Sequence, residues 1–299
     1  MGIMRITRAL RRGSRHKGLI TAMFVYHAKI DRAKLAAMSE NERVLMLLLA
    51  HASNEINVLQ KLLLMIRKDD PPSPIINDVE AGQAFIFIRL RVGKLHEAWE
   101  LFRIRVQSDR AICRTILPKL PPFAAASLSA LKRHFGQGSA LTAIRNNVSF
   151  HYADKANLIE ASFQQLPANE PLQFYLTQTV GNSFYHAGEL VAQMSALALV
   201  KAPPPAGPHD TSSAEARAFG ALCDEIIQVA GDMTELFGTL IAFLSEDVID
   251  SANQEILPDG PKVSQFSLPY FFDENDSLKV STISNEQQPW VLSALPKTT

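Results

Sequence analysis

The sequence contains few residues of the kinds that build disulfide, metal or cofactor sites. Its two cysteines, Cys113 and Cys223, are too few for a disulfide framework or a zinc knot. No glycine-rich phosphate loop, nucleophile elbow, paired Cys or His spacing or internal repeat is present. These absences disfavour oxidoreductases and nucleoside triphosphatases, and we expect no cofactor and no metal. The sparse cysteine also suits a reducing, cytoplasmic location.

Long uninterrupted apolar segments are also missing, since no run approaches the ~18 residues that span a bilayer. The apolar stretch at residues 18–26 follows a basic start and superficially resembles a signal peptide. However, charged residues at 27–31 stand where a small-residue cleavage site is required. We therefore expect a cytoplasmic protein with no membrane partner.

The chain has no net excess of either charge, because 30 basic residues balance 30 acidic ones. The distribution is uneven, and the first thirty residues hold no acid at all. We interpret residues 1–22 as a basic, flexible arm that contacts nucleic acid or simply keeps an unpatterned chain end soluble. The basic residues of this region are Arg5, Arg8, Arg11, Arg12, Arg15, Lys17 and Lys29.

Apolar residues at helical spacing dominate the rest of the chain, 47% of which is hydrophobic. A first helix is predicted from Ser39, where Ser39 and Glu42 have the spacing of a capping box, to just before Asp70. A second is predicted from Asn77, capped with Glu80. The second helix has an unbroken apolar stripe, formed by Phe85, Ile88, Val92, Leu95, Trp99, Phe102 and Val106.

Two further long helices are predicted in the second half of the chain. One begins near Pro171 and carries Gly181, Gly188 and Ser195 seven residues apart, a small-residue seam for close packing within the bundle or across a dimer axis. The other follows a proline-rich linker at 202–210 and is capped by Ser212 and Glu215. Its apolar stripe comprises Phe219, Leu222, Ile226, Val229, Met233, Leu236, Leu240 and Phe243.

These patterns predict an all-α fold, an antiparallel bundle of long helices over residues 23–250. Helical patterning disappears near residue 253. We expect the segment 251–299 to be a C-terminal extension that is irregular or forms a hairpin from 263–272 and 277–284.

An Arg followed after four to six residues by a His is the candidate functional motif. We interpret two of its three occurrences as accidents, because one lies in the basic arm and one within an amphipathic helix. The third lies where a helical pattern ends, with Asn146 directly after the Arg. The three pairs are Arg11 with His16, Arg91 with His96, and Arg145 with His151.

The spacing of the third pair requires a break in the helix. Six helical steps would leave Arg145 and His151 roughly 120° apart, so a straight helix would not direct both at one ligand. Asn146 and Asn147 favour a stop between them, since Asn tolerates the left-handed conformation that ends helices.

Residues 145–151 resemble the motif of the HEPN superfamily, helical bundles in which an Arg, often followed by Asn, precedes a His. The resemblance implies a homodimer whose two motifs face each other, and often a metal-independent endoribonuclease. Such a protein would act on RNA as a toxin or defence effector, with an antitoxin or another protein as a partner. Arg145, Asn146 and His151 would then be the catalytic residues.

Other charged residues are candidates for supporting this site. Glu55 falls within the apolar stripe of the first helix, so it either lies at the stripe's edge or receives a cation, for which Arg145 is one candidate. A basic cluster precedes the motif and offers a positive rim for phosphates, although a solvated face explains it equally well. Its members include Arg110, Arg114, Lys132 and Arg133.

The chemistry expected of the motif is RNA transesterification. RNA supplies its own nucleophile, the 2′-hydroxyl, so His151 would exchange protons while Arg145 holds the phosphate oxygens. The alternative is a non-catalytic helical module that binds a nucleotide, RNA or protein. In that case Arg145 would stabilise a helix end and His151 would make a structural hydrogen bond.

Overall fold

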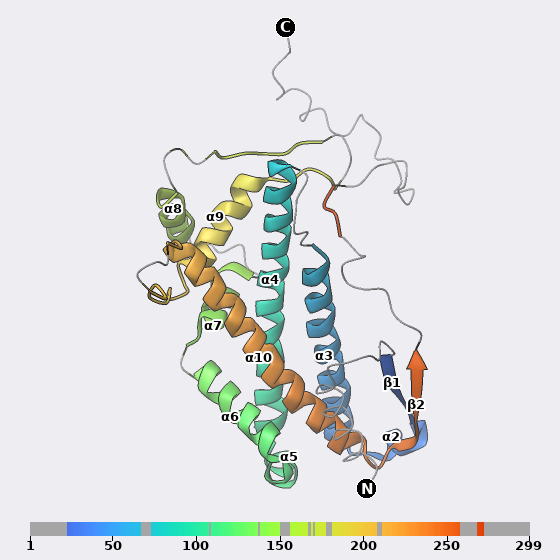
Figure 1. Ribbon diagram of the computed structural model, residues 1–299. Helices are drawn as coiled ribbons and strands as arrows, with labels where there is room; N and C mark the ends of the chain where they lie inside the picture. Colours follow the sequence, from blue (N-terminus) through green and yellow to red (C-terminus); the bar gives the residue numbers. More distant parts are fainter. Residues whose placement is uncertain are drawn as a thin grey trace.

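The computed structural model describes residues 23–66, 73–107, 109–136, 138–149, 156–166, 169, 171–177, 181–207, 211–257 and 268–271. Within these ranges the fold is all-α, as predicted, apart from one small sheet. Helices α3 (Glu40–Ile66) and α4 (Pro74–Phe102) lie side by side, and α10 (Ala214–Ser245) crosses them diagonally (Figure 1). The predicted basic arm, residues 1–22, lies outside the described residues.

Helix α3 begins where the sequence predicts, and α4 begins earlier. The Ser39 hydroxyl accepts a hydrogen bond from the Glu42 amide at 3.3 Å, as in a capping box, and donates one to the Glu42 carboxylate at 2.7 Å. For α4 the cap is Ser73, whose hydroxyl accepts from the Ile76 amide, and Pro74 occupies the first turn. The prediction of Asn77 as the cap is therefore wrong.

The shorter helices cover the bundle on one side of α4 (Figure 1). They are α5 (Arg110–Thr115), α6 (Pro122–Gly136), α7 (Ala140–Ile144), α8 (Ala156–Gln164) and α9 (His186–Leu197). Two π-helical turns interrupt this region, η1 (Arg103–Gln107) at the end of α4 and η3 (Arg145–Ser149) after α7, and a short 3-10 turn, η2 (Leu117–Lys119), follows α5. Helix α6 packs along α10, and α8 packs along α9.

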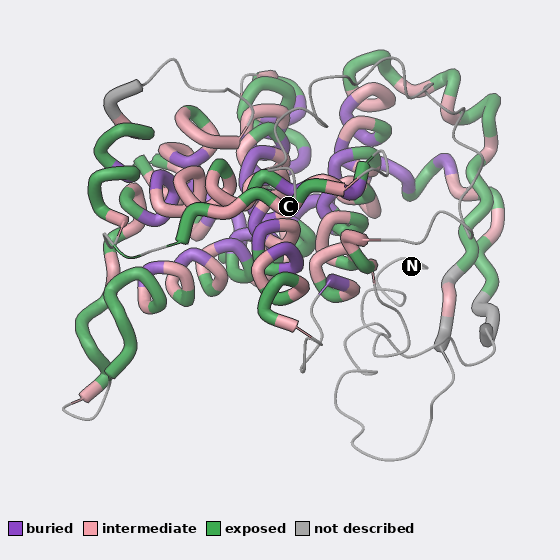
Figure 2. Tube along the Cα trace, turned by 90° about the horizontal axis from the view of Figure 1, so that it is seen from above, coloured by how far each residue is buried: buried purple, intermediate pink, exposed green. Residues whose placement is uncertain are grey.

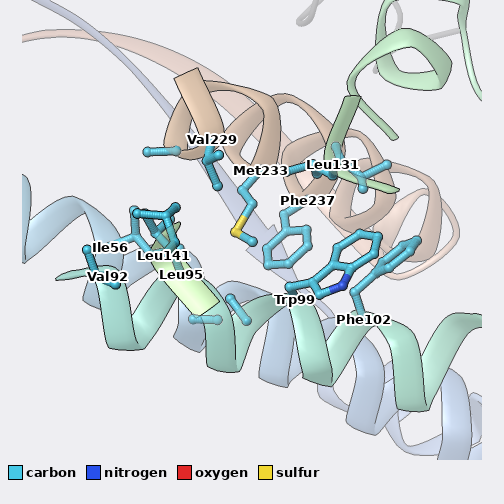
Figure 3. Close-up of a cluster of buried hydrophobic side chains, with 14 of the residues drawn as sticks. Ile56, Val92, Leu95, Trp99, Phe102, Leu131, Leu141, Val229, Met233 and Phe237 are labelled. Atoms are coloured by element: carbon cyan, nitrogen blue, oxygen red, sulfur yellow. The ribbon is translucent and has the colours of Figure 1, made fainter. Parts of the chain in front are cut away.

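The hydrophobic core lies where α3, α4, α6, α7 and α10 meet. Figure 3 shows that aromatic and aliphatic side chains from all five helices interdigitate there, including Ile56, Trp99, Leu131, Leu141 and Phe237. All seven residues of the predicted α4 stripe are buried, which confirms that Trp99 belongs to the core. Buried positions concentrate in the interior of the bundle in Figure 2 as well.

The predicted start of the third long helix, near Pro171, is wrong. Residues 171–177 and 181–185 are irregular, with an isolated bridge between Tyr175 and Phe184 and a turn at Gly181 with φ of 88°. Helix α9 begins only at His186. The segment is held on α4 because Phe184 packs directly over Gly82, and the Tyr175 hydroxyl donates a hydrogen bond to Asp78 at 2.8 Å.

The predicted small-residue seam does not exist as one helical edge. Gly181 lies outside the helix, and Ser195 is fully buried against α8, where its hydroxyl donates to Ser162 at 2.9 Å. These residues therefore give no support for a dimer axis. Helix α8 itself occupies a segment that the sequence indicated only as a connection.

The fourth helix and the proline-rich segment before it lie close to their predicted places. Ser213, rather than Ser212, caps α10 by accepting from the Ala216 amide, and the predicted stripe faces the core. Helix α10 is long and apolar enough, by length and composition alone, to cross a membrane. Its apolar stripe packs here against α3 and α6, and a core helix has the same composition.

The sheet pairs segments from opposite ends of the described chain. Strands β1 (Met23–Ile30) and β2 (Ile249–Leu257) run antiparallel and project beside the bundle as an exposed ribbon (Figures 1 and 2). Strand β2 crosses residue 250, where we placed a boundary. Of the predicted hairpin at 263–272 and 277–284, only residues 268–271 are described, and they are not in a strand.

Candidate functional site

The predicted motif begins at the junction between α7 and the π-helical turn η3. Arg145 ends α7 with right-handed backbone angles, and the helix widens through Ser149 instead of stopping at Asn146. The prediction of a left-handed stop at the asparagines is therefore wrong. The Asn147 side chain instead donates to the Ala143 carbonyl at 2.6 Å, which ties the π-helical turn to α7. Such turns occur frequently at functional sites.

Arg145 lacks an acidic partner among the described residues. Its Nη1 donates to the Asn146 carboxamide oxygen at 3.1 Å, and its buried Nε has no hydrogen-bond partner. A guanidinium held by a neutral amide keeps its full charge for a ligand. His151, the other half of the motif, lies outside the described residues, as do the aromatic residues Phe150 and Tyr152.

A second arginine fixes the motif turn against the bundle. Arg89 of α4 donates through Nη1 to the Val148 carbonyl at 3.3 Å and through Nη2 to the Glu189 carboxylate of α9 at 2.6 Å. Both partners are only partly exposed, so this ion pair is better shielded than a surface pair. The turn that carries Arg145 is therefore anchored to α4 and, through Arg89, to α9.

Beside the motif, a cleft of about 640 Å³ opens between α4, η1, α5, α6 and α7. This volume lies within the range of small-ligand sites, on the order of 300–1,000 Å³. Arg103, Glu100 and His96 enter it from α4 and η1, and Lys132 enters it from α6. The cleft therefore combines two basic side chains, a carboxylate and an imidazole.

The aromatic wall of the cleft is continuous with the core. Trp99 and Phe135 stack with ring centroids 5.2 Å apart and an interplanar angle of 11°. The His96 ring meets Phe135 edge-on at 5.9 Å. The imidazole therefore lies at the point where apolar packing changes into the charged part of the cleft.

Charges across the cleft shift the protonation of its groups. Burial lowers the pKa of His96, and the positive charge of Arg145 lowers it further. The pKa of Glu100 is lowered, chiefly because Arg103 donates hydrogen bonds to both of its carboxylate oxygens, at 3.1 and 2.7 Å. At neutral pH the cleft therefore holds a neutral imidazole beside an ionised carboxylate and several fixed cations.

The other predicted site residues are only partly brought together. Lys132 lines the cleft, whereas Arg133, on the same helix, lines a different cavity with His134 and Glu225. Arg110 and Arg114 are exposed on α5 and do not line the cleft, although Cys113 of that helix does. The predicted rim is therefore reduced to one residue that enters the cleft.

Glu55 has a different partner from the one suggested by the sequence. Its carboxylate pairs with Lys94 of α4 at 2.9 Å and lies 3.7 Å from His51 of its own helix. The idea that a cation meets Glu55 is correct, but that cation is Lys94 and not Arg145. Glu55 therefore belongs to the α3–α4 contact rather than to the cleft.

Sequence reasoning missed His96 and Glu100. The pair Arg91 and His96 was set aside as an accident within an amphipathic helix, and Arg91 is indeed buried away from the cleft lining. The available signal was the spacing of His96, Glu100 and Arg103, which places three polar side chains on one face of α4. The apolar stripe that predicts the helix contains none of these three residues, so it gives no indication of this face.

Metal ligands are not clustered in the described ranges, where no group of three or more His, Cys, Asp or Glu side chains could hold an ion. Comparisons with protein-family models, curated proteins and solved structures found no match to this chain. The resemblance to the HEPN superfamily therefore rests on residues 145–151 and their helical context.

Proposed function

We propose that this chain is a metal-independent endoribonuclease of the HEPN type, whose substrate is RNA bound at the cleft beside Arg145. The observation that supports the proposal is the position of Arg145, which has no acidic partner in the described structure and lies close enough to the cleft to influence His96. Lys132 adds positive charge along the same cleft, where Arg103 is paired with Glu100. A chain of phosphates is attracted by such an arrangement.

The reaction assigns a separate task to each motif residue. Arg145 holds the non-bridging phosphate oxygens, and Asn146 orients its guanidinium through the 3.1 Å hydrogen bond. His151 exchanges protons, a role that typically contributes about 10²–10⁴-fold to the rate. DNA lacks the 2′-hydroxyl and resists cleavage.

The same proposal includes a homodimer, because the resemblance implies that two motifs face one another. With two chains, two guanidinium groups would surround one phosphodiester. Sedimentation equilibrium at micromolar concentration tests this arrangement, and a monomer at all concentrations would contradict it. The proposal also includes a toxin or defence role, with an antitoxin as the protein partner, and a cytoplasmic location. Binding and localisation experiments test these parts.

The decisive experiment incubates the purified protein with mixed RNA in excess chelator. Wild type is expected to cleave RNA, and the variants Arg145→Ala and His151→Ala are expected to lose that activity while remaining folded. Arg32→Ala, an exposed arginine at the start of helix α2 (Arg32–Ala37), serves as the matched control. Intact RNA with wild type, or cleavage only after adding divalent metal, would refute the mechanism.

A second candidate is a module that binds RNA, a nucleotide or a protein without cleaving it. The half-buried ring of Phe135 in the cleft wall favours it, since aromatic rings bind bases and apolar groups. Under this alternative, His151→Ala would lower the free energy of unfolding, and RNA would be retained on the protein uncleaved. A binding assay run beside the cleavage assay distinguishes the two functions.

A further inference from the structure

His96 occupies a place in the cleft that the motif does not explain. It lies on the face of α4 that also carries Glu100 and Arg103, and it contributes to the same cleft as Lys132. Its Nδ1 is buried without a hydrogen-bond partner. One ring nitrogen of His134 and one of His186 are buried in the same way, so what distinguishes His96 is its place in the lining of this charged cleft.

The charged groups around His96 come from four elements. Glu97 and Glu100 of α4 favour its protonated form, whereas Arg145 of η3 opposes it, and burial opposes it most strongly. Lys132 of α6 and Arg103 of η1, which is paired with Glu100, also line the cleft. The net result is a pKa held below the ordinary value, so the ring is neutral and able to accept a proton near neutral pH.

We propose that His96 is the proton acceptor for the 2′-hydroxyl of RNA bound in this cleft. This inference rests on the proposed ribonuclease function. In the step, the 2′-oxygen forms a bond to phosphorus as its proton passes to the His96 imidazole. The bond from phosphorus to the 5′-oxygen breaks, and that oxygen takes a proton from solvent, to which His96 later returns the proton it accepted. The products are a 2′,3′-cyclic phosphate and a 5′-hydroxyl, without oxidation or reduction.

Arg145 has two functions in this arrangement. Its charge stabilises the phosphate, and the same charge keeps His96 unprotonated until the hydroxyl is deprotonated. Transfer of a proton to His96 then places two cations near one another, which favours return of the proton to solvent after cleavage.

The main competing explanation is that His96 is a packing residue, held by its edge-on contact with Phe135. Loss of activity in a His96→Ala variant does not by itself separate the two roles. Chemical rescue does, because the alanine variant leaves space beside an open cleft for free imidazole. Added imidazole restores a proton acceptor, but it is not attached to the chain and does not restore the packing of the side chain.

The test measures RNA cleavage in excess chelator for wild type, His96→Ala and the control His51→Ala, whose side chain is 70% exposed on α3. We expect His96→Ala to lose about 10²–10⁴-fold in rate and to regain part of it with added imidazole. His51→Ala should match wild type. Activity of His96→Ala within threefold of wild type, or a folded variant that imidazole does not rescue, would overturn the inference.

A pH profile provides the independent measurement. Wild-type kcat/KM should fall as the pH drops through a value below about 6.5, where His96 becomes protonated. His96→Gln fills the same space without titrating, so its residual activity should lack this acid limb. A wild-type profile without that limb, or a His96→Gln profile that retains it, would overturn the inference. If wild type does not cleave RNA at all, the proposed function fails and this inference fails with it; if only the His96 variants behave like wild type, the inference alone fails.

Discussion

At the residue scale, the site depends on how single polar groups are satisfied or left unsatisfied. Glu55 was a candidate for the site because of its position in an apolar stripe, and Lys94 accounts for it completely. Arg145 is the reverse case, since its position at a helix end is ordinary but, among the described residues, its side chain hydrogen-bonds a neutral amide and forms no salt bridge. The absence of a carboxylate partner identifies a candidate binding group better than spacing does.

Gly82 is the glycine at which an added methyl group is expected to lower the free energy of unfolding. A Cβ at this position would lie 2.4 Å from the end of the Phe184 ring, so Phe184 must move away from α4. We expect Gly82→Ala to lower the free energy of unfolding by about 1–3 kcal/mol. Gly220→Ala, in an exposed part of α10 with open space around it, should instead raise stability by about 0.4–1 kcal/mol. Urea denaturation of both variants checks the prediction, and equal effects would contradict it.

His134 predicts how stability depends on pH. Its Nε2 lies 3.3 Å from Glu225 across the contact between α6 and α10, and burial lowers its pKa more than nearby Asp232 raises it. Because the unfolded chain then binds a proton more tightly, stability is lost as the pH falls from about 6.5 to the lower pKa of the folded protein. Burial raises the pKa of Glu225, so that group has the opposite effect as it protonates.

The measurement compares wild type with His134→Gln in urea at pH 7.5 and pH 5.5. Wild type should lose more stability than the variant on acidification, because the variant lacks the titrating ring while retaining Glu225 and His96. Identical losses in the two proteins would show that His134 does not titrate differently on folding.

At the element scale, the sequence predicts what repeats locally and misses what depends on distant contacts. The stripes of α4 and α10 follow from helical spacing alone, and both are confirmed. The start of α9 was predicted wrongly because Pro171 suits a first helical turn. What prevents a helix there is the seating of Phe184 on Gly82 and of Tyr175 on Asp78, contacts almost a hundred residues apart.

The candidate site divides in the same way. The face of α4 with His96, Glu100 and Arg103 can be recognised from spacings of four and three residues. The approach of this face to Arg145 and Lys132 cannot be predicted from spacing, because that approach depends on how α6 and α7 pack against α4. The π-helical turn at Arg145 also has no local signal that distinguishes it from a helix end.

The caps allow a sharp test of the helix boundaries. Ser73→Ala removes the hydroxyl that accepts from the Ile76 amide, and we expect it to lower the free energy of unfolding by about 1 kcal/mol. Asn77→Ala, the position that the sequence pattern favoured, should leave stability unchanged or slightly raised, since alanine is the better helix former. Thermal and urea unfolding of the two variants provide the comparison. A greater loss in Asn77→Ala would contradict the observed helix start.

At the scale of the whole molecule, the helical bundle and the two-stranded ribbon contribute unequally to stability. No described strand residue belongs to the core cluster, whereas Leu35 and Met38, just after β1, pack against it. An isolated two-stranded sheet is marginally stable by itself. The ribbon is therefore expected to depend on the bundle, and the bundle is not expected to depend on the ribbon.

Truncation tests this asymmetry. A chain that begins at Asp31 loses β1 but keeps the aspartate that caps α2, and it should retain the helical circular dichroism spectrum and a single unfolding transition. A chain that begins at Glu40 also loses Leu35 and Met38, and it should unfold at a clearly lower urea concentration. If the first truncation abolishes the cooperative transition, the ribbon is part of the core unit.

The pairing of β1 with β2 also determines the order in which the protein folds. Met23 meets Leu257, more than two hundred residues away in the chain, so the loop closed by this pairing contains the entire helical bundle. The entropy of closing such a loop from an unfolded chain is large, and it falls once the helices have packed and brought the two segments close. The ribbon therefore forms after the bundle, and during synthesis β1 stays without its strand partner until nearly all of the helices have emerged.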